Sequence, residues 1–283
     1  MDRRKFVLSS CTTLLLAGCK SAQASPTLRI SMIPTTDPGK IVRQSQPLVD
    51  YLQKQTGAKI ELTVPTSYAA VVEAITSDRV DIAYLGGFTY VQAAARAGVR
   101  PLVQRLKDKN FHSLFITQTN SPIQTMADLK GKTFAFGDIN STSGHLMPSY
   151  YMRQEKVDPA VIEKAIFTGG HDATALAVAH KRVDAGSMDE LVYRSMLQAA
   201  TITPEQVRVF YTTPPFFDYV WVARAGLDPM LADKFTRTLL RLDEANPQDK
   251  TLLDLLNAQK YAVAQASDYG PLRQAAKDDG LLR

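Results

Sequence analysis

Two patterns of apolar residues alternate along most of the chain. Short stretches of alternating or consecutive apolar residues predict β-strands, and stretches in which apolar residues recur every three or four positions predict helices. The expected strands are residues 28–33, 59–64, 80–85, 102–104, 113–117, 133–136, 165–167, 183–186, 207–211 and 219–223. The expected helices are residues 39–55, 67–76, 88–97, 150–156, 172–181 and 191–199, together with most of the chain after residue 223. Such alternation predicts an α/β fold with a largely parallel sheet and helices on both faces.

Two breaks that contain proline interrupt this alternation. Asn120-Ser121-Pro122 follows the fifth expected strand, and Pro214-Pro215 follows the ninth. The block between them has strands and helices of its own, so the chain is expected to cross twice between two lobes. We predict one lobe from residues 27–118 and 215–283 and a second lobe from residues 119–214. The carboxyl ends of the strands in both lobes are then expected to face one cleft, where open α/β sheets bind ligands.

The loops after the expected strands carry polar and aromatic side chains. These positions are Tyr68, Gly86-Gly87, Ser141 to Ser143, His171, Asp189-Glu190 and Asp218. The set contains neither lysine nor arginine, and it is suited to a small polar ligand. Taken alone, the three acids are equally well explained as solvated loop residues, and His171 as a residue that orients the following helix.

The segment Gly137–Pro148 joins an expected strand to the next helix and contains three hydroxyl residues in a row, Ser141 to Ser143. The first turn of a helix has unpaired backbone N–H groups and favours negative charge, and hydroxyl side chains add donors. One hydroxyl residue is enough for an ordinary N-cap, and three followed by Gly144 exceed that need. The segment therefore predicts an anion site. Pro148 removes an early helical hydrogen bond, so the helix is expected to be kinked or to begin after Ser143.

The N-terminal residues have the features of a secretory signal peptide. Arg3-Arg4-Lys5 precedes a short apolar run that ends in Leu16-Ala17-Gly18-Cys19, and this run is too short to span a membrane. The last four residues are similar to a bacterial lipobox, so we predict a lipoprotein signal peptide at residues 1–19, lipidation of Cys19, and a tether at residues 20–26. The paired arginines fit both the general secretory and the twin-arginine export routes. The expected location is the periplasm or cell envelope, with a lipid anchor.

Composition narrows the function classes. The 283 residues include 45% hydrophobic and 22% charged residues, which is ordinary for a globular protein. Both cysteines, Cys11 and Cys19, lie in the signal segment, so the folded part has no disulfide, cysteine nucleophile or cysteine-ligated metal. The net charge of +5 is scattered and gives no basic stripe for nucleic acid. The four histidines lack metal-ligand spacing, and neither a metal nor a cofactor is expected.

Five segments carry a family resemblance, namely residues 66–73 (TSYAAVVE), 80–86 (VDIAYLG), 137–144 (GDINSTSG), 170–178 (GHDATALAV) and the neighbourhood of Asp218. Together they resemble the periplasmic binding proteins of phosphonate and phosphite ABC transporters, and they span nearly all of the mature chain. The resemblance implies a two-lobed type II periplasmic binding protein that closes on a small phosphorus oxyanion in the interlobe cleft. The implied partners are the permease and ATPase subunits of the transporter, and the protein is expected to be a monomer and not an enzyme.

The resemblance also implies which residues contact the ligand. Hydroxyl and backbone N–H groups of Ser141, Thr142 and Ser143 are expected to hold the phosphonate oxygens. Tyr68 is expected to donate its phenolic hydroxyl from the other lobe, and His171 to donate a ring N–H. Asp218 corresponds to an acidic contact of the family. A second acidic contact is either Asp189 or Glu190.

Two further residues are candidates for the wall of the site. Tyr84 ends the third expected strand, where a tyrosine is also commonly half-buried in the core. Phe111-His112 stands where family members often have an aromatic pair, so His112 is expected to change which substituent on phosphorus fits. The C-terminal part is also shorter than in members for aminoalkylphosphonates. Both departures favour a small ligand, phosphite or methylphosphonate.

Two other functions stay open at this point. A binding protein for phosphate, sulfonate or another small oxyanion would need a similar site. A hydrolase would need an activated nucleophile, and Ser141 to Ser143 lack the GxSxG frame of a nucleophile elbow.

Overall fold

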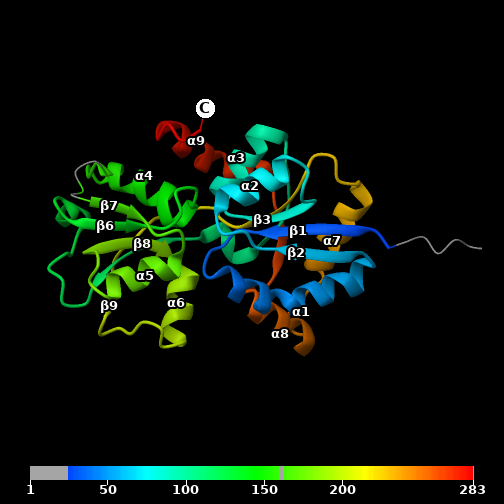
Figure 1. Cartoon of the computed structure of the whole chain (residues 1–283), viewed down its shortest axis with the longest axis horizontal. Coiled ribbons are helices and arrows are strands. Elements are labelled where there is room, and N and C mark those ends of the chain that lie inside the picture. The colour runs from blue at the N-terminus through cyan, green and yellow to red at the C-terminus, as the bar shows by residue number, and fades with distance from the viewer. Residues whose placement is uncertain (1–24, 160–161, 163, 283) are drawn as a thin grey trace, which may run out of the picture.

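The computed structural model describes residues 25–159, 162 and 164–282. The predicted signal peptide at residues 1–19, with Cys19, and most of the predicted tether lie outside the described residues. The described chain forms two lobes side by side, each built around one β-sheet (Figure 1). The predicted two-lobed α/β architecture is confirmed.

The first lobe contains a six-stranded sheet with the order β11-β4-β10-β3-β1-β2. Its strands are β1 (Thr27–Met32), β2 (Lys59–Thr63), β3 (Ile82–Leu85), β4 (Arg100–Arg105), β10 (Val220–Ala223) and β11 (Tyr261–Val263). One face is covered by α1 (Pro38–Thr56), α7 (Pro229–Leu240) and α8 (Pro247–Leu255). The other face is covered by α2 (Tyr68–Thr76), α3 (Gly87–Ala97) and α9 (Gly270–Asp278). The core of this lobe consists of the two apolar layers between sheet and helices.

The second lobe contains a five-stranded sheet with the order β7-β6-β8-β5-β9. Its strands are β5 (Ser113–Gln118), β6 (Thr133–Phe136), β7 (Lys164–Phe167), β8 (Ala185–Asp189) and β9 (Val207–Thr212). Helices α5 (His171–Ala179) and α6 (Glu190–Gln198) cover one face, and α4 (Met147–Gln154) lies on the other. Short turns complete the chain: η1 (Leu106–Asn110), η2 (Met126–Leu129), η5 (Ala266–Tyr269) and the π-helix η3 (Thr142–Leu146).

Helix α1 shows how local sequence sets the helix ends. The Asp37 side chain accepts a hydrogen bond from the backbone N–H of Lys40 at 2.7 Å, and Pro38 occupies the first turn, where its missing N–H costs nothing. The helix ends at Gly57, whose φ of 70° is left-handed and suits glycine. The helix predicted at residues 39–55 is confirmed.

Strand direction differs from the prediction of a largely parallel sheet. β1 pairs in parallel with β2 and β3, and β6 pairs in parallel with β7 and β8. The other strand pairs of the described residues are antiparallel. The crossings explain part of this result, because β5 enters the second sheet directly from the first lobe, and β10 returns from the second. Neither strand is reached through the helix that a parallel neighbour requires.

One lobe boundary and one short strand also differ from the predictions. β5 pairs with β8 and β9 in the second sheet, so the first lobe ends before Ser113 and not at residue 118. β11 lies in a stretch predicted to be helical, and its three residues pair with β4. A strand this short has too few residues to show an alternating pattern.

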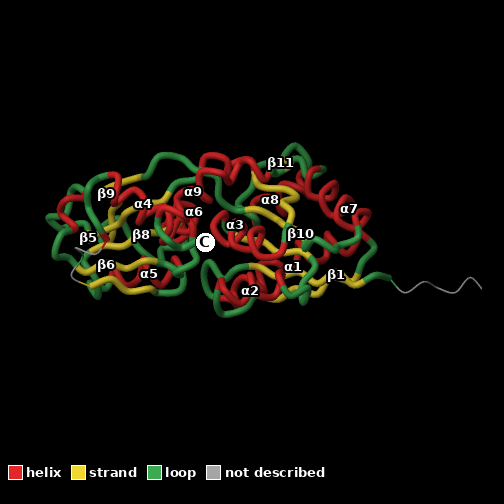
Figure 2. The backbone as a smooth tube through the Cα atoms, turned by 90° about the horizontal axis from the view of Figure 1, so that it is seen from above, coloured by secondary structure: helices red, strands yellow, loops and turns green. Residues whose placement is uncertain are grey.

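The two crossings, residues 106–112 and 213–219, run next to each other. Phe111 and Phe216 exchange two backbone hydrogen bonds of 2.9 Å. The C-terminal end of the chain lies at the upper edge of the molecule in Figure 1, and seen from above it is over the border between the lobes (Figure 2). The crossings therefore form one paired connection beside which the lobes meet.

Hydrogen bonds also join the lobes directly. The Phe88 N–H of the first lobe donates to Thr142 Oγ1 at 3.0 Å, and the His171 N–H of the second lobe donates to the Thr35 carbonyl at 3.0 Å. The lobes are thus closed on each other in this structure.

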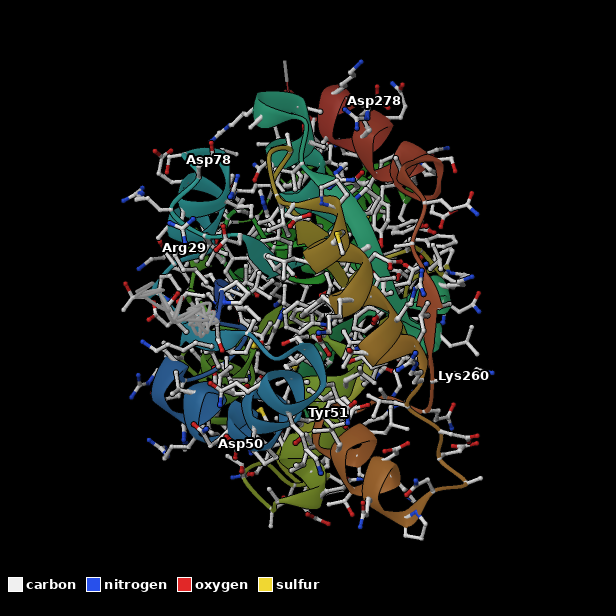
Figure 3. The ribbon with its side chains drawn as sticks, turned by 90° about the vertical axis from the view of Figure 1, so that its right-hand side faces the viewer. Arg29, Asp50, Tyr51, Asp78, Lys260 and Asp278 are labelled. Atoms are coloured by element: carbon white, nitrogen blue, oxygen red, sulfur yellow. The ribbon has the colours of Figure 1, made fainter. Side chains whose placement is uncertain are left out.

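The surface of the first lobe carries many charged side chains (Figure 3). Arg29 is one of them, and its guanidinium donates to both carboxylate oxygens of Asp81. Among the described helices, none has the length and apolar character needed to cross a membrane. Within the same residues, no three His, Cys, Asp or Glu side chains gather as a metal site would require.

Candidate ligand-binding site

The turn between β6 and α4 is built around two glycines. The Gly137 N–H donates to the Gly144 carbonyl at 3.0 Å, which folds the segment back on itself. A Cβ on Gly144 would lie 2.9 Å from Ser141 Oγ and 3.0 Å from His171 Cε1, so only glycine allows this approach. The π-helix η3 follows Ser141, and α4 begins at Met147 with Pro148 in its first turn. The prediction that the α-helix begins after Ser143 is confirmed.

The three hydroxyls of this turn are buried and differ in their partners. Ser141 Oγ accepts the Gly144 N–H at 3.0 Å, as an N-cap does. Thr142 Oγ1 accepts the Phe88 N–H, and it lies beside Gly86 of the first lobe, as does Asp218 Oδ1. Ser143 is 1% exposed, and its Oγ has no hydrogen-bond partner among the described residues. The turn therefore offers one unused hydroxyl, beside one that caps the turn itself and one that bonds to the other lobe.

His171, at the start of α5, is fully buried, and its ring protonation can be assigned. Its Nδ1 accepts the Asp189 backbone N–H at 3.2 Å. Burial lowers the pKa of the His171 ring below its ordinary value, so the neutral ring carries its hydrogen on Nε2. Nε2 has no partner among the described residues. His171 is thus a hydrogen-bond donor, and this tautomer cannot act as a base toward the neighbouring serines.

Asp218 lies at the end of the second crossing and is 1% exposed. Its Oδ1 accepts the Gly87 N–H at the start of α3, at 2.9 Å, and Oδ2 has no partner among the described residues. Burial raises the pKa of Asp218 to about 7. The side chain can therefore accept a hydrogen bond as a carboxylate or donate one as an acid near neutral pH.

Tyr68 begins α2 and is 1% exposed. Its backbone N–H is 3.5 Å from Asp138 Oδ2, and its phenol is within hydrogen-bonding reach of the Ser141 side chain. Burial raises the pKa of the Tyr68 phenol well above its ordinary value, so the hydroxyl stays protonated. The phenol of the first lobe thus lies beside the serine turn of the second.

The predicted second acid differs from Asp218 because its oxygens are already used. Asp189 Oδ1 accepts the Leu191 and Val192 N–H groups at 2.6 and 2.9 Å as the N-cap of α6, and Oδ2 accepts the Tyr219 hydroxyl at 2.7 Å. Glu190 accepts the His112 N–H at 3.2 Å and pairs with Arg194. Both acids have protein partners that account for their burial.

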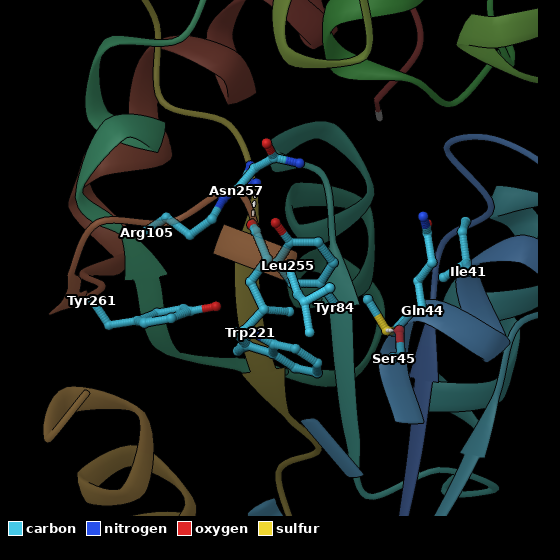
Figure 4. Close-up of a pocket in the computed structure, with 11 residues that line it drawn as sticks. Ile41, Gln44, Ser45, Tyr84, Arg105, Trp221, Leu255, Asn257 and Tyr261 are labelled. Atoms are coloured by element: carbon cyan, nitrogen blue, oxygen red, sulfur yellow. Dashed lines mark hydrogen bonds between the residues drawn. The ribbon is translucent and has the colours of Figure 1, made fainter. Parts of the chain in front are cut away.

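Tyr84 and His112 have partners outside this cluster. The Tyr84 ring lines a cavity of about 120 Å³ with Arg105, Trp221 and Tyr261, against α1 and α8 (Figure 4). His112 Nδ1 bonds the Thr213 carbonyl at 2.7 Å within the paired crossings. The structure therefore brings together Tyr68, the serine turn, His171 and Asp218, and it gives Tyr84 and His112 other neighbours.

Two residues near the cluster were not predicted. Arg105 is buried, forms an ion pair with Asp108 at 2.6 Å, and lies over the Tyr219 ring at 5.1 Å. Tyr219 bonds Asp189 across the lobes. The position of Tyr219 directly after Asp218 was the available signal for it, whereas no sequence pattern placed Arg105 near the site. Because Asp108 neutralises Arg105, the cluster has no free cation among the described residues.

Comparison with known proteins gives the family. A family model described as ABC transporter, phosphonate, periplasmic substrate-binding protein matches residues 30–269. The probable ABC transporter phosphite binding protein PhnD1 of Prochlorococcus marinus (strain MIT 9301) is 28% identical over 297 aligned residues, covering 100% of both chains. The phosphate-import protein PhnD of Mycolicibacterium smegmatis is 30% identical over 249 residues, covering 80% of this chain and 78% of that protein.

A solved structure agrees with these relatives. The structure of PhnD1 from Prochlorococcus marinus in complex with methylphosphonate superposes with a TM-score of 0.85 at 27% identity. The match covers 90% of this chain and 99% of that one. The similarity therefore extends over both lobes.

Proposed function

This chain belongs to the periplasmic substrate-binding proteins of phosphonate ABC transporters, and from that premise we propose that its buried interlobe cluster holds a small phosphorus oxyanion. Members of this family bind a substrate for transport and do not convert it. One observation carries the proposal. Ser143 Oγ, His171 Nε2 and Asp218 Oδ2 are buried polar atoms that have no hydrogen-bond partner in the part of the chain that the structure describes, and they come from both lobes. Buried polar atoms are nearly always hydrogen-bonded, so atoms left unpaired at one place favour a ligand there.

The donors suit an oxyanion. Ser143 donates its hydroxyl and His171 its Nε2–H, and Tyr68 adds a protonated phenol. Ser141 accepts a backbone N–H through its lone pair and keeps its hydroxyl hydrogen for a further acceptor. Hydrogen bonds to a charged acceptor are stronger than neutral ones, so several neutral donors can replace a lysine or arginine.

Asp218 gives the site its selectivity. As a carboxylate, its free Oδ2 accepts a hydrogen bond from a P–OH group and repels an anion that has only acceptors, such as sulfate. A ligand that contacts Asp218 of the first lobe and Ser143 and His171 of the second also joins the two lobes. The ligand is thus expected to stabilise the closed arrangement.

Among ligands with a P–OH group, we propose phosphite or methylphosphonate. The similarity to a probable phosphite-binding protein and to a structure in complex with methylphosphonate supports this choice. Phosphate is the second candidate, because the relative from Mycolicibacterium smegmatis is a phosphate-import protein. Asp218 does not separate these three anions, since each presents a P–OH near neutral pH.

Calorimetry tests the proposal. The chain from residue 21 onward, which contains the whole described fold, is titrated with phosphite, methylphosphonate, aminoethylphosphonate, phosphate and sulfate. We expect tight binding of phosphite or methylphosphonate, weaker binding of phosphate and none of sulfate. Tight binding of phosphate over both reduced compounds would favour the second candidate. No binding of any of the five anions would overturn the function.

Export and anchoring are part of the same proposal. We propose that Cys19 is lipidated and tethers the protein to the envelope beside its permease and ATPase partners. Labelling of cells with a fatty-acid analogue is expected to mark the wild-type chain and not Cys19→Ala. Equal labelling of both would remove the lipid anchor from the proposal.

A further inference from the structure

The Tyr219 ring is held firmly in the first lobe. It stacks on Tyr84 with ring centroids 5.4 Å apart and an angle of 12°, and its edge meets Phe111 at 5.4 Å. The Arg105 guanidinium lies over its face, 5.1 Å from the centroid. Tyr219 is 4% exposed. Because the ring is packed on several sides, the direction of its hydroxyl is set by the first lobe alone.

This hydroxyl reaches into the second lobe. It donates to Asp189 Oδ2 at 2.7 Å, and burial raises the pKa of the Tyr219 phenol well above its ordinary value, which keeps it a donor. Asp189 also stands next to the first crossing, because it pairs with Ser113 at the start of β5. The bond therefore links the lobes near their paired crossings.

Asp189 in turn orients His171. Its carboxylate is fixed by Tyr219 on one oxygen and by the start of α6 on the other, and its backbone N–H donates to His171 Nδ1 at 3.2 Å. That bond puts the ring hydrogen on Nε2, the atom left without a partner. A partner behind a histidine commonly fixes its tautomer and its direction.

We propose that Tyr219 is a positioning residue, which acts through Asp189 to hold the His171 donor of the second lobe in place relative to Asp218 of the first. This role rests on the proposed function of the site, because it explains how the two halves of that site keep one geometry. Asp189 then serves this link and the α6 cap, and does not contact the ligand.

The test compares Tyr219→Phe with a matched control, Tyr269→Phe. Tyr269 is also a fully buried tyrosine of the first lobe, but its hydroxyl donates to Gln104 Oε1 at 2.8 Å within that lobe. The first measurement is side-chain nitrogen NMR of the ligand-free chain, with the His171 signals assigned by their loss in His171→Gln. We expect the Nε2–H tautomer in the wild type and in Tyr269→Phe, and shifted or mixed His171 signals in Tyr219→Phe.

The second measurement is affinity for methylphosphonate and phosphite. Loss of a hydrogen bond to a buried charge predicts a decrease of about tenfold or more for Tyr219→Phe and less than about twofold for Tyr269→Phe. Unchanged His171 signals in Tyr219→Phe would overturn the proposal, even with weaker binding, since Tyr219 would then act on the ligand directly. If Tyr219→Phe does not fold, Asp189→Asn is the second variant, because it keeps the backbone N–H and one cap acceptor. The same shift of the His171 signals is expected there, and its absence would overturn the proposal.

The two proposals fail separately. A wild-type chain that binds none of the anions contradicts the proposed function. The NMR comparison is made without ligand and still decides whether Tyr219 sets the His171 ring.

Discussion

Asp189 and Asp218 are both buried aspartates, one in each lobe, and their surroundings differ. Asp189 uses both oxygens, two backbone N–H groups on one and the Tyr219 hydroxyl on the other. Asp218 uses Oδ1 for Gly87 and leaves Oδ2 without a partner among the described residues. From the sequence, Asp218 was expected to be an acidic contact, and Asp189 was one of two candidates for a second acidic contact. Burial alone thus does not distinguish the two acids, whereas the unpaired oxygen does, and it is the basis on which we propose Asp218 as the ligand-binding acid.

The largest expected effect is a change with pH in the free energy of unfolding, caused by the titration of Asp218. An acid whose pKa is raised from 3.8 to about 7 on folding holds its proton more tightly in the folded state. Its contribution to stability is therefore full below about pH 4 and falls as pH rises to about 7, by on the order of 4 kcal/mol. Urea unfolding of the ligand-free chain between pH 4 and pH 8 is expected to show this loss in the wild type relative to Asp218→Asn, which cannot titrate.

Parallel pH curves for the two chains would contradict this prediction. They would mean that the carboxylate of Asp218 is solvated or paired in solution, and the contrast with Asp189 would disappear. A difference that grows with pH would instead sharpen the contrast. The buried acid would then be held ready for a ligand at a cost to stability.

The next effect in size is on Asp189. Asp189→Ala leaves two backbone N–H groups and a buried phenol without an acceptor, so we expect a loss of about 3 kcal/mol in the free energy of unfolding. The matched control is Asp228→Ala, because Asp228 caps α7 with one bond to the Met230 N–H at an exposed site. Loss of an ordinary cap costs about 1 kcal/mol. Equal losses in the two variants would show that the bond to Tyr219 contributes nothing to stability.

Much of the fold could be predicted because helix and strand periodicity is local. The apolar face of α1 and its end at Gly57 depend on neighbours in sequence, and the same holds for the serine turn with its proline. Strand direction could not be predicted in this way, because alternation is the same for parallel and antiparallel strands. β5 and β10 were misjudged for this reason.

The same distinction between local and long-range features applies to the site. Its residue types and loops could be predicted, since hydroxyls, a histidine and acids follow the strands. Which polar atoms are free could not, because that depends on partners distant in sequence. The Tyr219 hydroxyl donates to Asp189, 30 positions away in the sequence, and the Phe88 N–H donates to Thr142, 54 positions away. Arg105 was not predicted as a residue near the site. Its charge is paired with Asp108 inside a single turn.

A third, smaller effect tests the unpaired hydroxyl. Ser143→Ala is expected to weaken methylphosphonate or phosphite binding about tenfold, which is about 1.4 kcal/mol. The free energy of unfolding is expected to stay equal or rise, because a buried hydroxyl without a partner is removed. Ser31→Ala is the control, since Ser31 Oγ is also buried and has no partner within the described ranges, but lies in β1. Equal affinities for Ser143→Ala and the wild type would remove Ser143 from the site.

The smallest expected effect belongs to Glu190, the other candidate for the second acidic contact. Its Oε2 pairs with Arg194, whose side chain is 67% exposed, and its Oε1 accepts the His112 N–H. Glu190→Gln keeps an acceptor for that N–H and loses an exposed ion pair, so the expected loss of stability is about 0.5 kcal/mol. Ligand affinity, measured by calorimetry beside the urea midpoint, is expected to stay within about twofold, as for other changes outside a contact. A decrease of tenfold or more would make Glu190 the second acidic contact. A carboxylate with two protein partners would then also bind the ligand, and an unpaired oxygen would no longer distinguish the binding acid.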